Sequence, residues 1–381
     1  MDQPTAKKLL KHGAIFLFLD VPEGTEFGID LKSWNTGEKF RGVKMIPPGI
    51  HYVFYNSVSS TGDTAPRVGF FHNFKSGEVL ARKWDKINED MSMDVVPQSE
   101  ISVLMDNIRM LDQFLGPYPF EILQRWKQLT SHLNENLLYN LMPLSGKIRS
   151  ALELVSCKDC DRPKGNKIIE DGPSTSKRRS TRIDCDELLD NLLPDMKPIA
   201  GTEIRFTPIP SKRYPDGSSP SEITKHCMDQ SYILDVLLED SITDMDLLGE
   251  MQFSYICFLV GHSMEAFQQW KQIICLVCSC EDIIVKYQSM YEEFLSILEM
   301  HVKEIPEEFL ADICSNNNFV YVKLRQLFGY IIMPRVSQKL KNKVDRLIKM
   351  LSKNYDWDFS HLESEDEDDA PVVVELGDCT Y

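Results

Sequence analysis

The spacing of hydrophobic residues changes near residue 98 of this chain, and this change constrains the fold most. Before it, short runs of branched and aromatic residues alternate with turn-forming glycines and prolines, a pattern typical of strands. After it, apolar residues recur every three or four positions, as they do along one face of a helix. A chain that shows the two patterns in succession is expected to fold as an α+β protein with two domains.

Four runs in the first ninety residues are predicted strands, at residues 14–19, 50–55, 68–74 and 78–84. Turn sequences such as "PEGTEFG", "PPG" and "KSGE" separate them. No helix-length pattern lies between any two of these runs, so an antiparallel, sandwich-like domain is expected rather than a parallel sheet. Two helices, at about residues 98–115 and 119–132, would close one end of this domain, which we place at residues 1–150.

A second, all-helical domain is predicted at residues 201–356. Its periodic segments cover residues 219–240, 247–261, 264–277, 281–302, 307–313, 319–333 and 336–355, and they are expected to form a compact bundle. Between the domains, residues 151–200 are predicted to be a flexible linker, because the part from 157 to 198 is polar and carries few apolar residues. One short helix is predicted inside it, at residues 186–193.

The formal net charge of −16 excludes some partners and favours others. A surface this acidic repels phosphate backbones, so we expect no direct nucleic-acid binding without a local basic patch. Proteins with basic faces are the expected partners. The apolar runs are too short to span a membrane, and the N-terminal residues lack the pattern of a signal peptide. We therefore expect free thiols and a location in the cytoplasm, extending to the nucleus.

Residue patterns typical of catalytic and metal sites are absent. Cys157 and Cys160 have the spacing of a zinc half-site, with Cys185 downstream, but nothing between Cys160 and Cys185 supplies a histidine or a second cysteine pair. The cysteines at 275, 278 and 280 are expected to fill a helical core. The sequence has no nucleophile elbow, phosphate-binding loop or zinc-binding helix motif. We predict no enzyme, no catalytic residue, no cofactor and no metal. The histidines are scattered along the chain and form no ligand pair: His12, His51, His72, His132, His226, His262, His301 and His361.

Two further stretches allow more than one interpretation. The basic cluster "SKRRSTR", with Ser176 and Ser180 as candidate phosphorylation sites, fits a nuclear-localisation element, a phosphorylation switch or a solvated loop. The stretch "GVKMIPPGIHYVF" holds two prolines and a glycine between strand-like flanks, which predicts a stiff turn. We interpret that turn as architecture rather than as a recognition loop.

The C-terminal tail, residues 357–381, is the sharpest feature. Six of the seven residues from 363 to 369 are acidic, and "PVVVEL" comes after them. A strand left alone has unpaired backbone groups, so it should pair with the edge of this protein's own sheet or with that of a partner. We predict partner binding by strand addition, with the acidic run as a leash and Ser364 as a candidate phosphorylation site. The alternative is a disordered, solubilising tail. The strand residues are Val372, Val373, Val374, Glu375 and Leu376.

Several stretches together resemble one family. They are "GTEFGID", "KFRGVKMIPPGIH", "LDQFLGPYP", "GTEIRF", "EITKH", "EAFQQWK", "WDF" and "APVVVEL". In these the chain is similar to the a1-alpha2-repression splicing factor family, assembly chaperones of the U5 small nuclear ribonucleoprotein. The resemblance spans nearly the whole chain apart from residues 157–198.

The resemblance implies a β-rich N-terminal domain, a helical C-terminal domain similar to VHS domains, and no enzymatic activity. It implies binding to the RNase H-like domain of the largest U5 scaffold protein, pre-mRNA-processing-splicing factor eight, and to its neighbouring Jab/MPN domain. Other U5 particle proteins would be nearby partners. Binding of this kind would prevent premature docking of the helicase and of RNA. The alternative function is a VHS-like, peptide-binding adaptor in trafficking, and RNA binding is a third hypothesis that conflicts with the net charge.

Overall fold

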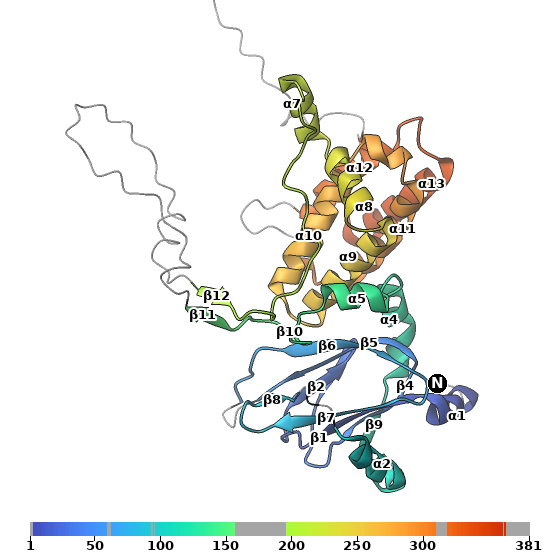
Figure 1. The fold of residues 1–381 in the computed structure, drawn as a ribbon. Coiled ribbons are helices and arrows are strands. Elements are labelled where there is room, and N and C mark those ends of the chain that lie inside the picture. The colour runs from blue at the N-terminus through green and yellow to red at the C-terminus, as the bar shows by residue number, and fades with distance from the viewer. Residues whose placement is uncertain are drawn as a thin grey trace, which may run out of the picture.

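The computed structural model of this chain describes residues 3–58, 62–92, 94, 96–156, 196–309, 318–360 and 362. The described residues before 157 form a β-rich body, and most of those after 196 form a helical body stacked on it (Figure 1). The predicted fold class, β-rich followed by helical, is confirmed. The predicted helix at residues 186–193 lies outside the described residues.

Two five-stranded sheets form the β-rich body. The first is antiparallel, as predicted, in the order β10-β6-β5-β2-β3. The second, in the order β8-β7-β1-β4-β9, is mixed. In it β1 pairs in parallel with β7, and β4 in parallel with β9. The strands are β1 (Ala14–Leu19), β2 (Glu26–Ile29), β3 (Lys32–Asn35), β4 (Gly42–Ile46), β5 (Gly49–Asn56), β6 (Val68–Phe74), β7 (Val79–Asp85), β8 (Asp90–Met91), β9 (Leu115–Pro117) and β10 (Ile148–Arg149).

The parallel pairs were not anticipated from the sequence. Parallel neighbours need a crossover connection, and the sequence offers no helix between residues 19 and 79 to make one. The crossover is made of strands instead. After β1 the chain forms β2 and β3 of the first sheet, β4 of the second, and β5 and β6 of the first, and it then returns to the second sheet as β7, parallel to β1. The sandwich itself supplies the connection that a helix usually provides.

The first sheet is buried on both faces. Side chains of a strand point alternately to opposite faces, and on β5 Tyr52 and Phe54 join the core beneath the helices. Val53 and Tyr55, between and after them, join the core between the two sheets. The molecule therefore has three layers: the mixed second sheet, the antiparallel first sheet in the middle, and helices over the first sheet (Figure 1). This explains why residues 52–55 form a continuous apolar run rather than an alternating one.

Short helices border the sandwich. The predicted helix at residues 98–115 is divided into α2 (Gln98–Asp106), α3 (Ile108–Leu111) and the 3-10 turn η1 (Asp112–Phe114), and its end becomes β9. The second predicted helix is found as η2 (Phe120–Ile122) and α4 (Leu123–Leu129). The sequence pattern did not predict α1 (Gln3–His12) or α5 (Glu135–Leu141). It did not predict β9 because a three-residue edge strand acquires its pairing only from β4.

The helical body is built around α9, in which every residue from 247 to 258 is buried. The predicted cap at Ser219 is present, as a capping box with Glu222 at the start of α7. The helices are α7 (Pro220–Met228), α8 (Ser231–Asp240), α9 (Asp244–Leu259), α10 (Met264–Cys278), α11 (Gln288–Glu304), α12 (Phe319–Ile331) and α13 (Gln338–Tyr355), with 3-10 turns η3 (Asp282–Val285) and η4 (Glu307–Phe309).

One hydrophobic core joins the two bodies. Phe71 on β6 meets Phe253 on α9 with ring centroids 5.1 Å apart, and both side chains are buried. Arg67 donates to the Val260 carbonyl at 2.8 Å and pairs with Glu26 at 2.9 Å, so one guanidinium links the sheet to the end of α9. Burial of this kind makes the two bodies depend on each other for stability.

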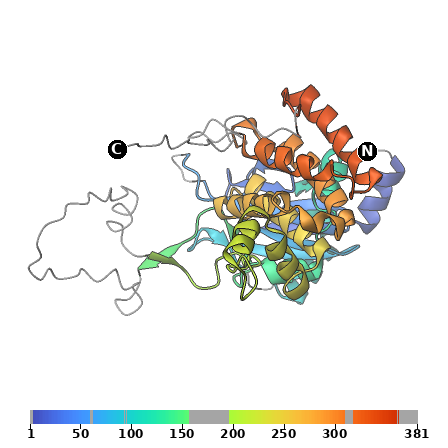
Figure 2. The same ribbon diagram turned by 90° about the horizontal axis from the view of Figure 1, so that it is seen from above.

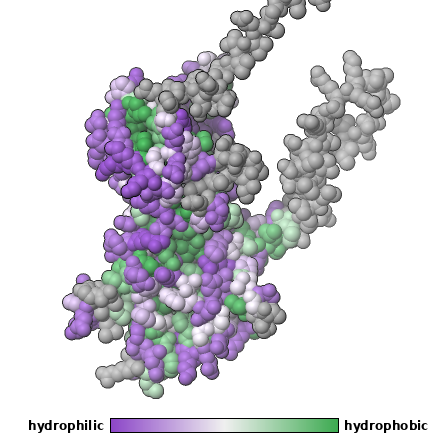
Figure 3. Space-filling model, turned by 180° about the vertical axis from the view of Figure 1, so that it is seen from behind, coloured by the Kyte–Doolittle hydropathy of each residue, from purple (hydrophilic) through white to green (hydrophobic). Residues whose placement is uncertain are grey.

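The side chain of Gln252 on α9 provides a polar link across the same junction. Its oxygen accepts from the His132 backbone N–H at 2.8 Å, and its amide donates to the Gln128 carbonyl at 3.2 Å. Seen from the opposite side, hydrophobic side chains gather where the bodies meet (Figure 3). A buried amide whose donor and acceptor are both satisfied fixes orientation as well as contact.

We expect the substitution Phe253→Ala to lower the free energy of unfolding by about 3–5 kcal/mol, because it opens a cavity in the shared core. Both bodies should still unfold in one transition, measured in urea by circular dichroism and by tryptophan fluorescence. The control Ile87→Ala, at a side chain that is 91% exposed, should change stability by less than about 0.5 kcal/mol. Two separate transitions in the unsubstituted protein would contradict a shared core.

Candidate partner-binding surfaces

The predicted site residues of the tail, Ser364 and residues 372–376, lie outside the described residues, as do Ser176 and Ser180 of the basic cluster. The same holds for Cys157, Cys160 and Cys185. The strand-addition and phosphorylation predictions therefore remain predictions. What the structure does describe is the base of the tail, residues 356–360 and 362.

The base of the tail is held against α12. The chain reverses after α13 at Asp356, whose φ of 55° is in the left-handed region that ends many helices. Phe359 then enters the core, with its ring centroid 5.3 Å from that of Tyr321 and 5.2 Å from that of Phe328. Trp357 packs beside it against Tyr355, at 5.6 Å. The motif "WDF" is thus an anchor made of aromatic packing.

Hydrogen bonds fix the backbone of this anchor. Ser352 on α13 donates to the Trp357 carbonyl at 2.7 Å, and Arg325 on α12 donates to the Ser360 carbonyl at 2.9 Å. Tyr321 donates to the Asp358 carbonyl. Side-chain donors on two helices therefore position a segment that has no regular structure of its own. The tail leaves the helical body from a defined place on α12.

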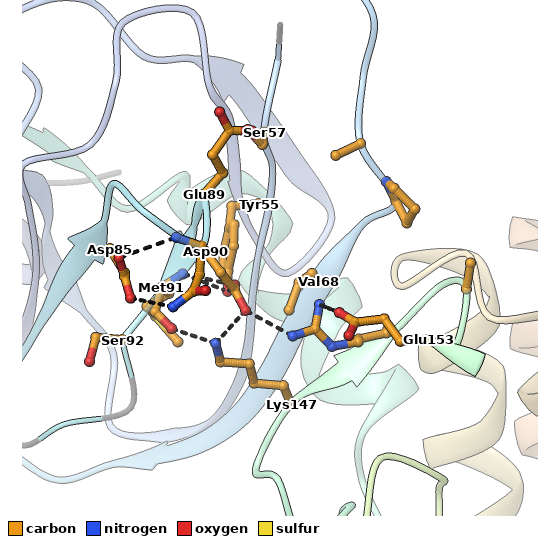
Figure 4. Close-up of a pocket in the computed structure, with 15 residues that line it drawn as sticks. Tyr55, Ser57, Val68, Asp85, Glu89, Asp90, Met91, Ser92, Lys147 and Glu153 are labelled. Carbon is orange, nitrogen blue, oxygen red and sulfur yellow. Dashed lines mark hydrogen bonds and ion pairs between the residues drawn. The ribbon is translucent and has the colours of Figure 1, made fainter. Parts of the chain in front are cut away.

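A polar cleft of about 660 Å³ lies in the β-rich body. In it Asp90 on β8 accepts from Tyr55 and from Lys147, the latter at 2.7 Å, and Lys147 points across the cleft to reach it (Figure 4). Arg149 on β10 also donates to Asp90, at 2.8 Å. The carboxylate therefore joins β8, β5 and β10, which are not consecutive in the sequence.

The electrostatics of the cleft favour structure over catalysis. Burial opposes the charged form of Asp90, but hydrogen bonds from Lys147 and Tyr55 and the nearby positive charges outweigh it and hold the pKa of that carboxyl below its usual value. Burial, followed by the charge of Asp90, raises the pKa of Tyr55. An ionised carboxylate with all its partners in place is a poor proton acceptor. We infer that this network clamps the strands together.

Two buried histidines, to which the sequence analysis assigned no role, likewise make contacts that hold separate segments together. His51 joins Asp30 at 2.7 Å through Nδ1 and the Pro47 carbonyl at 2.8 Å through Nε2. It thereby braces the proline turn, in which Gly49 has a φ of 139°, and the architectural interpretation of that turn fits these contacts. His301 accepts from the Trp270 indole, and burial lowers its pKa to about 3, so it stays neutral.

Two of the three cysteines predicted to fill the helical core do so, whereas Cys275 is only partly buried. Cys278 and Cys280 are fully buried beside the apolar face of α10, and burial raises the pKa of each thiol. Among the described residues, no group of three or more metal-ligating side chains comes together. No helix in the described part of the chain is both long enough and apolar enough to cross a bilayer.

A surface that the sequence pattern did not predict is the two-stranded ribbon of β11 (Leu154–Ser156) and β12 (Met196–Pro198). It projects away from both bodies (Figure 1, Figure 2) and carries hydrophobic side chains (Figure 3). Leu154 and Val155 are about half exposed. Three-residue strands separated by a long insert leave no periodic signal, so only the folded chain shows them as partners.

Comparison with known proteins gives matches over nearly the whole chain. A family model described as "AAR2 N-terminal domain" matches residues 12–143, and one described as "AAR2 C-terminal repeat region" matches residues 206–360. A Homo sapiens protein named "Protein AAR2 homolog" is 39% identical over 385 residues, covering 99% of this chain and 97% of that protein. Neither model's description names an enzyme.

More distant relatives match over a similar length. A Caenorhabditis elegans protein of the same name is 36% identical over 355 residues, which cover 92% of this chain and 96% of that protein. The Saccharomyces cerevisiae protein "A1 cistron-splicing factor AAR2" is 21% identical over 376 residues, covering 94% of this chain and 96% of its own length.

We expect Asp90→Asn to lower the free energy of unfolding at neutral pH by about 2–4 kcal/mol, because it leaves Lys147 buried without a counter-charge. The folded pKa of Asp90 is depressed, so its contribution is present above the unfolded value of about 3.9 and is lost as the pH falls further. Urea unfolding of both proteins at several pH values measures the difference, which should shrink below about pH 4.

The matched control for this prediction is Glu153→Gln, on the same cleft. The Glu153 side chain is 61% exposed and lies 3.5 Å from Arg149, so its loss should change stability by less than about 0.5 kcal/mol. Equal losses for the two variants, or a difference that does not depend on pH, would show that Asp90 is not the charge that holds the strands.

Proposed function

The chain belongs to the AAR2 family, and from this premise we propose that it acts in pre-mRNA splicing as a non-catalytic assembly factor of the U5 small nuclear ribonucleoprotein. The Saccharomyces cerevisiae relative is named as a splicing factor. The two family models match most of both bodies. This supports assigning to the chain a family function that depends on the whole fold. Such a role is consistent with a cytoplasmic location that extends to the nucleus.

The proposed partner is the RNase H-like domain of the large U5 scaffold protein, with the neighbouring Jab/MPN domain as a second contact. Occupying these domains in a precursor particle would prevent premature docking of the helicase and of RNA. Other U5 particle proteins would then be neighbours. The observation that supports the proposal is the anchor at Trp357 and Phe359. It fixes the base of a tail whose sequence is acidic and then β-prone to a helical body that shares its core with the β-rich body.

Binding would divide between the platform and the tail. Each main-chain hydrogen bond of an added strand contributes about 0.5–1.5 kcal/mol net, so five residues supply a few kcal/mol before their ordering is subtracted. The folded bodies would therefore carry most of the affinity, and residues 372–376 would tune it. Phosphorylation at Ser364 would add negative charge to the leash and so strengthen its attraction to a basic face.

The alternative of a trafficking adaptor has less support. It rests on a likeness of helical domains alone, and fold does not imply function. We keep it as an outcome of the binding experiment with the U5 scaffold protein.

We expect calorimetry to detect binding of this protein to the isolated RNase H-like domain of the U5 scaffold protein. Truncation after Leu362 removes the acidic run and the strand but keeps every residue that the structure describes. The truncated chain should bind about tenfold more weakly, which corresponds to roughly 1.4 kcal/mol.

A pair of proline variants separates the strand from the rest of the tail. Val373→Pro removes one backbone donor within the strand and should reproduce much of the loss, whereas Thr380→Pro, beyond the strand, should not. Unchanged binding after truncation would exclude strand addition and leave the platform as the binding surface. Binding by neither form would exclude this partner, and the adaptor function would then be tested with trafficking peptides.

A further inference from the structure

Helix α13 is basic in a chain that is acidic overall. It carries six basic residues and one acidic residue, whereas the whole chain has a formal net charge of −16. The basic residues are Lys339, Lys341, Lys343, Arg346, Lys349 and Lys353. Nothing in the proposed function uses this helix, which lies at the margin of the helical body in both views (Figure 1, Figure 2).

Packing places three of these cations on one outward stripe. The helix buries Leu340, Val344, Leu347 and Leu351, whose spacing of four, three and four residues defines the inward face. Three exposed cations have a spacing of three and four residues on the opposite side of the helix. We call these three, Arg346, Lys349 and Lys353, the basic stripe.

The basic stripe is not neutralised by the part of the chain that the structure describes. Lys339, outside the stripe, pairs with Glu292 on α11 at 2.5 Å. Within the stripe, Arg346 donates to the Asn342 carbonyl on its own helix, at 3.3 Å. No described carboxylate forms an ion pair with Lys349 or Lys353. Like charges one turn apart destabilise a helix, so an anion bound here would relieve repulsion.

The described chain ends beside the helix that neighbours the stripe. The Leu362 carbonyl lies next to Gly329 on α12, 3.4 Å from where a β-carbon would stand. Helices α12 and α13 pack against each other, and packed helix axes lie about 8–10 Å apart. The acidic run, residues 363–369, begins at the next position. Seven extended residues reach about 23–25 Å, and the stripe is only about 10 Å long.

We propose that the basic stripe of α13 binds the chain's own acidic run, residues 363–369, in the free protein. Charge complementarity selects an acidic segment, and the anchor at Trp357 and Phe359 starts that segment within reach. A tether of this length gives the acidic run an effective concentration on the order of 1 mM near the stripe. A free anionic polymer would not match this concentration, because a chain of net charge −16 repels it. The stripe is thus an intramolecular binding site for an acidic peptide.

This contact would hold the tail on α13 in the free protein. If the proposed function holds, a basic surface on the partner would compete for the acidic run and release the strand residues 372–376 beyond it. That consequence rests on the proposed function, whereas binding of the acidic run to α13 does not. The test of the stripe uses no partner protein. Its failure would therefore not contradict the proposed function, and failure of the proposed function would not contradict binding of the acidic run to α13.

The probe is a fluorescein-labelled peptide of residues 363–370, "ESEDEDDA", which lacks the valines. Fluorescence anisotropy would measure its binding to the chain truncated after Leu362 and to the full chain, at low salt. With a peptide dissociation constant of about 0.1 mM and a tethered competitor at about 1 mM, the full chain should bind it about tenfold more weakly. Raising the salt should weaken binding to the truncated chain.

Two charge-reversed variants of the truncated chain locate the site. The triple change Arg346→Glu, Lys349→Glu and Lys353→Glu should abolish binding. The matched triple Lys32→Glu, Lys39→Glu and Lys86→Glu alters three exposed cations of the β-rich body, changes the net charge equally, and should leave binding within about twofold. Urea unfolding checks that each variant is folded.

Three results would overturn the proposal. The first is equal peptide binding by the full and truncated chains, which would show that the stripe is not occupied by the tail. The second is an equal loss in both triple variants, which would show a response to net charge rather than a site. A peptide with the acids replaced by amides, "QSQNQNNA", must fail to bind; if it binds as well as the acidic peptide, charge does not carry the recognition.

Discussion

The contact between Phe71 on β6 and Phe253 on α9 lies at the centre of the structure, and the other features depend on it. The sheet that carries Phe71 is apolar on both faces, so it is stable only as a middle layer. Separation of the bodies would expose Tyr52 and Phe54 to water. Because the helical body is held in this way, the place where the tail leaves α12 is also held relative to the β-rich body. A tail that acts on a partner gains from such a fixed origin, since less freedom is lost on binding.

Three buried or half-buried polar side chains, Asp90, His51 and Arg67, are joined to their neighbours by several hydrogen bonds each. Asp90 binds two cations and a phenol, and His51 has both ring nitrogens occupied. Arg67 meets a carbonyl, an amide oxygen and a carboxylate. An active site needs at least one group with a free position and a pKa suited to proton transfer. These three side chains have their polar atoms engaged in networks that connect separate strands and helices.

Charge is distributed so that one chain carries both members of an attractive pair. The acidic run and the basic stripe are close in sequence, yet a linear count of charges hides the pair within a net value of −16. Interaction between exposed charges falls off over a Debye length of about 8 Å at physiological salt, so proximity decides which charges matter. The reversal of the chain at Asp356 turns residues 357–360 back along α12, the neighbour of the helix that carries the basic stripe.

The sequence by itself determined the features that arise from local periodicity and local chemistry. Strands β1, β5, β6 and β7, helices α9, α10, α12 and α13 and the cap at Ser219 are readable because the residues that define each element are neighbours in the chain. The segment predicted at residues 219–240 is two helices, α7 and α8. The core role of Cys278 and Cys280 is predicted by their apolar surroundings in the same way.

Only the tertiary structure decided the pairing of distant segments. The parallel pairing of β1 with β7, the conversion of residues 115–117 into a strand, the clamp between Asp90 and Lys147, and the docking of Phe359 on α12 all join residues from separate elements. Contacts of this kind depend on packing, which no local pattern encodes.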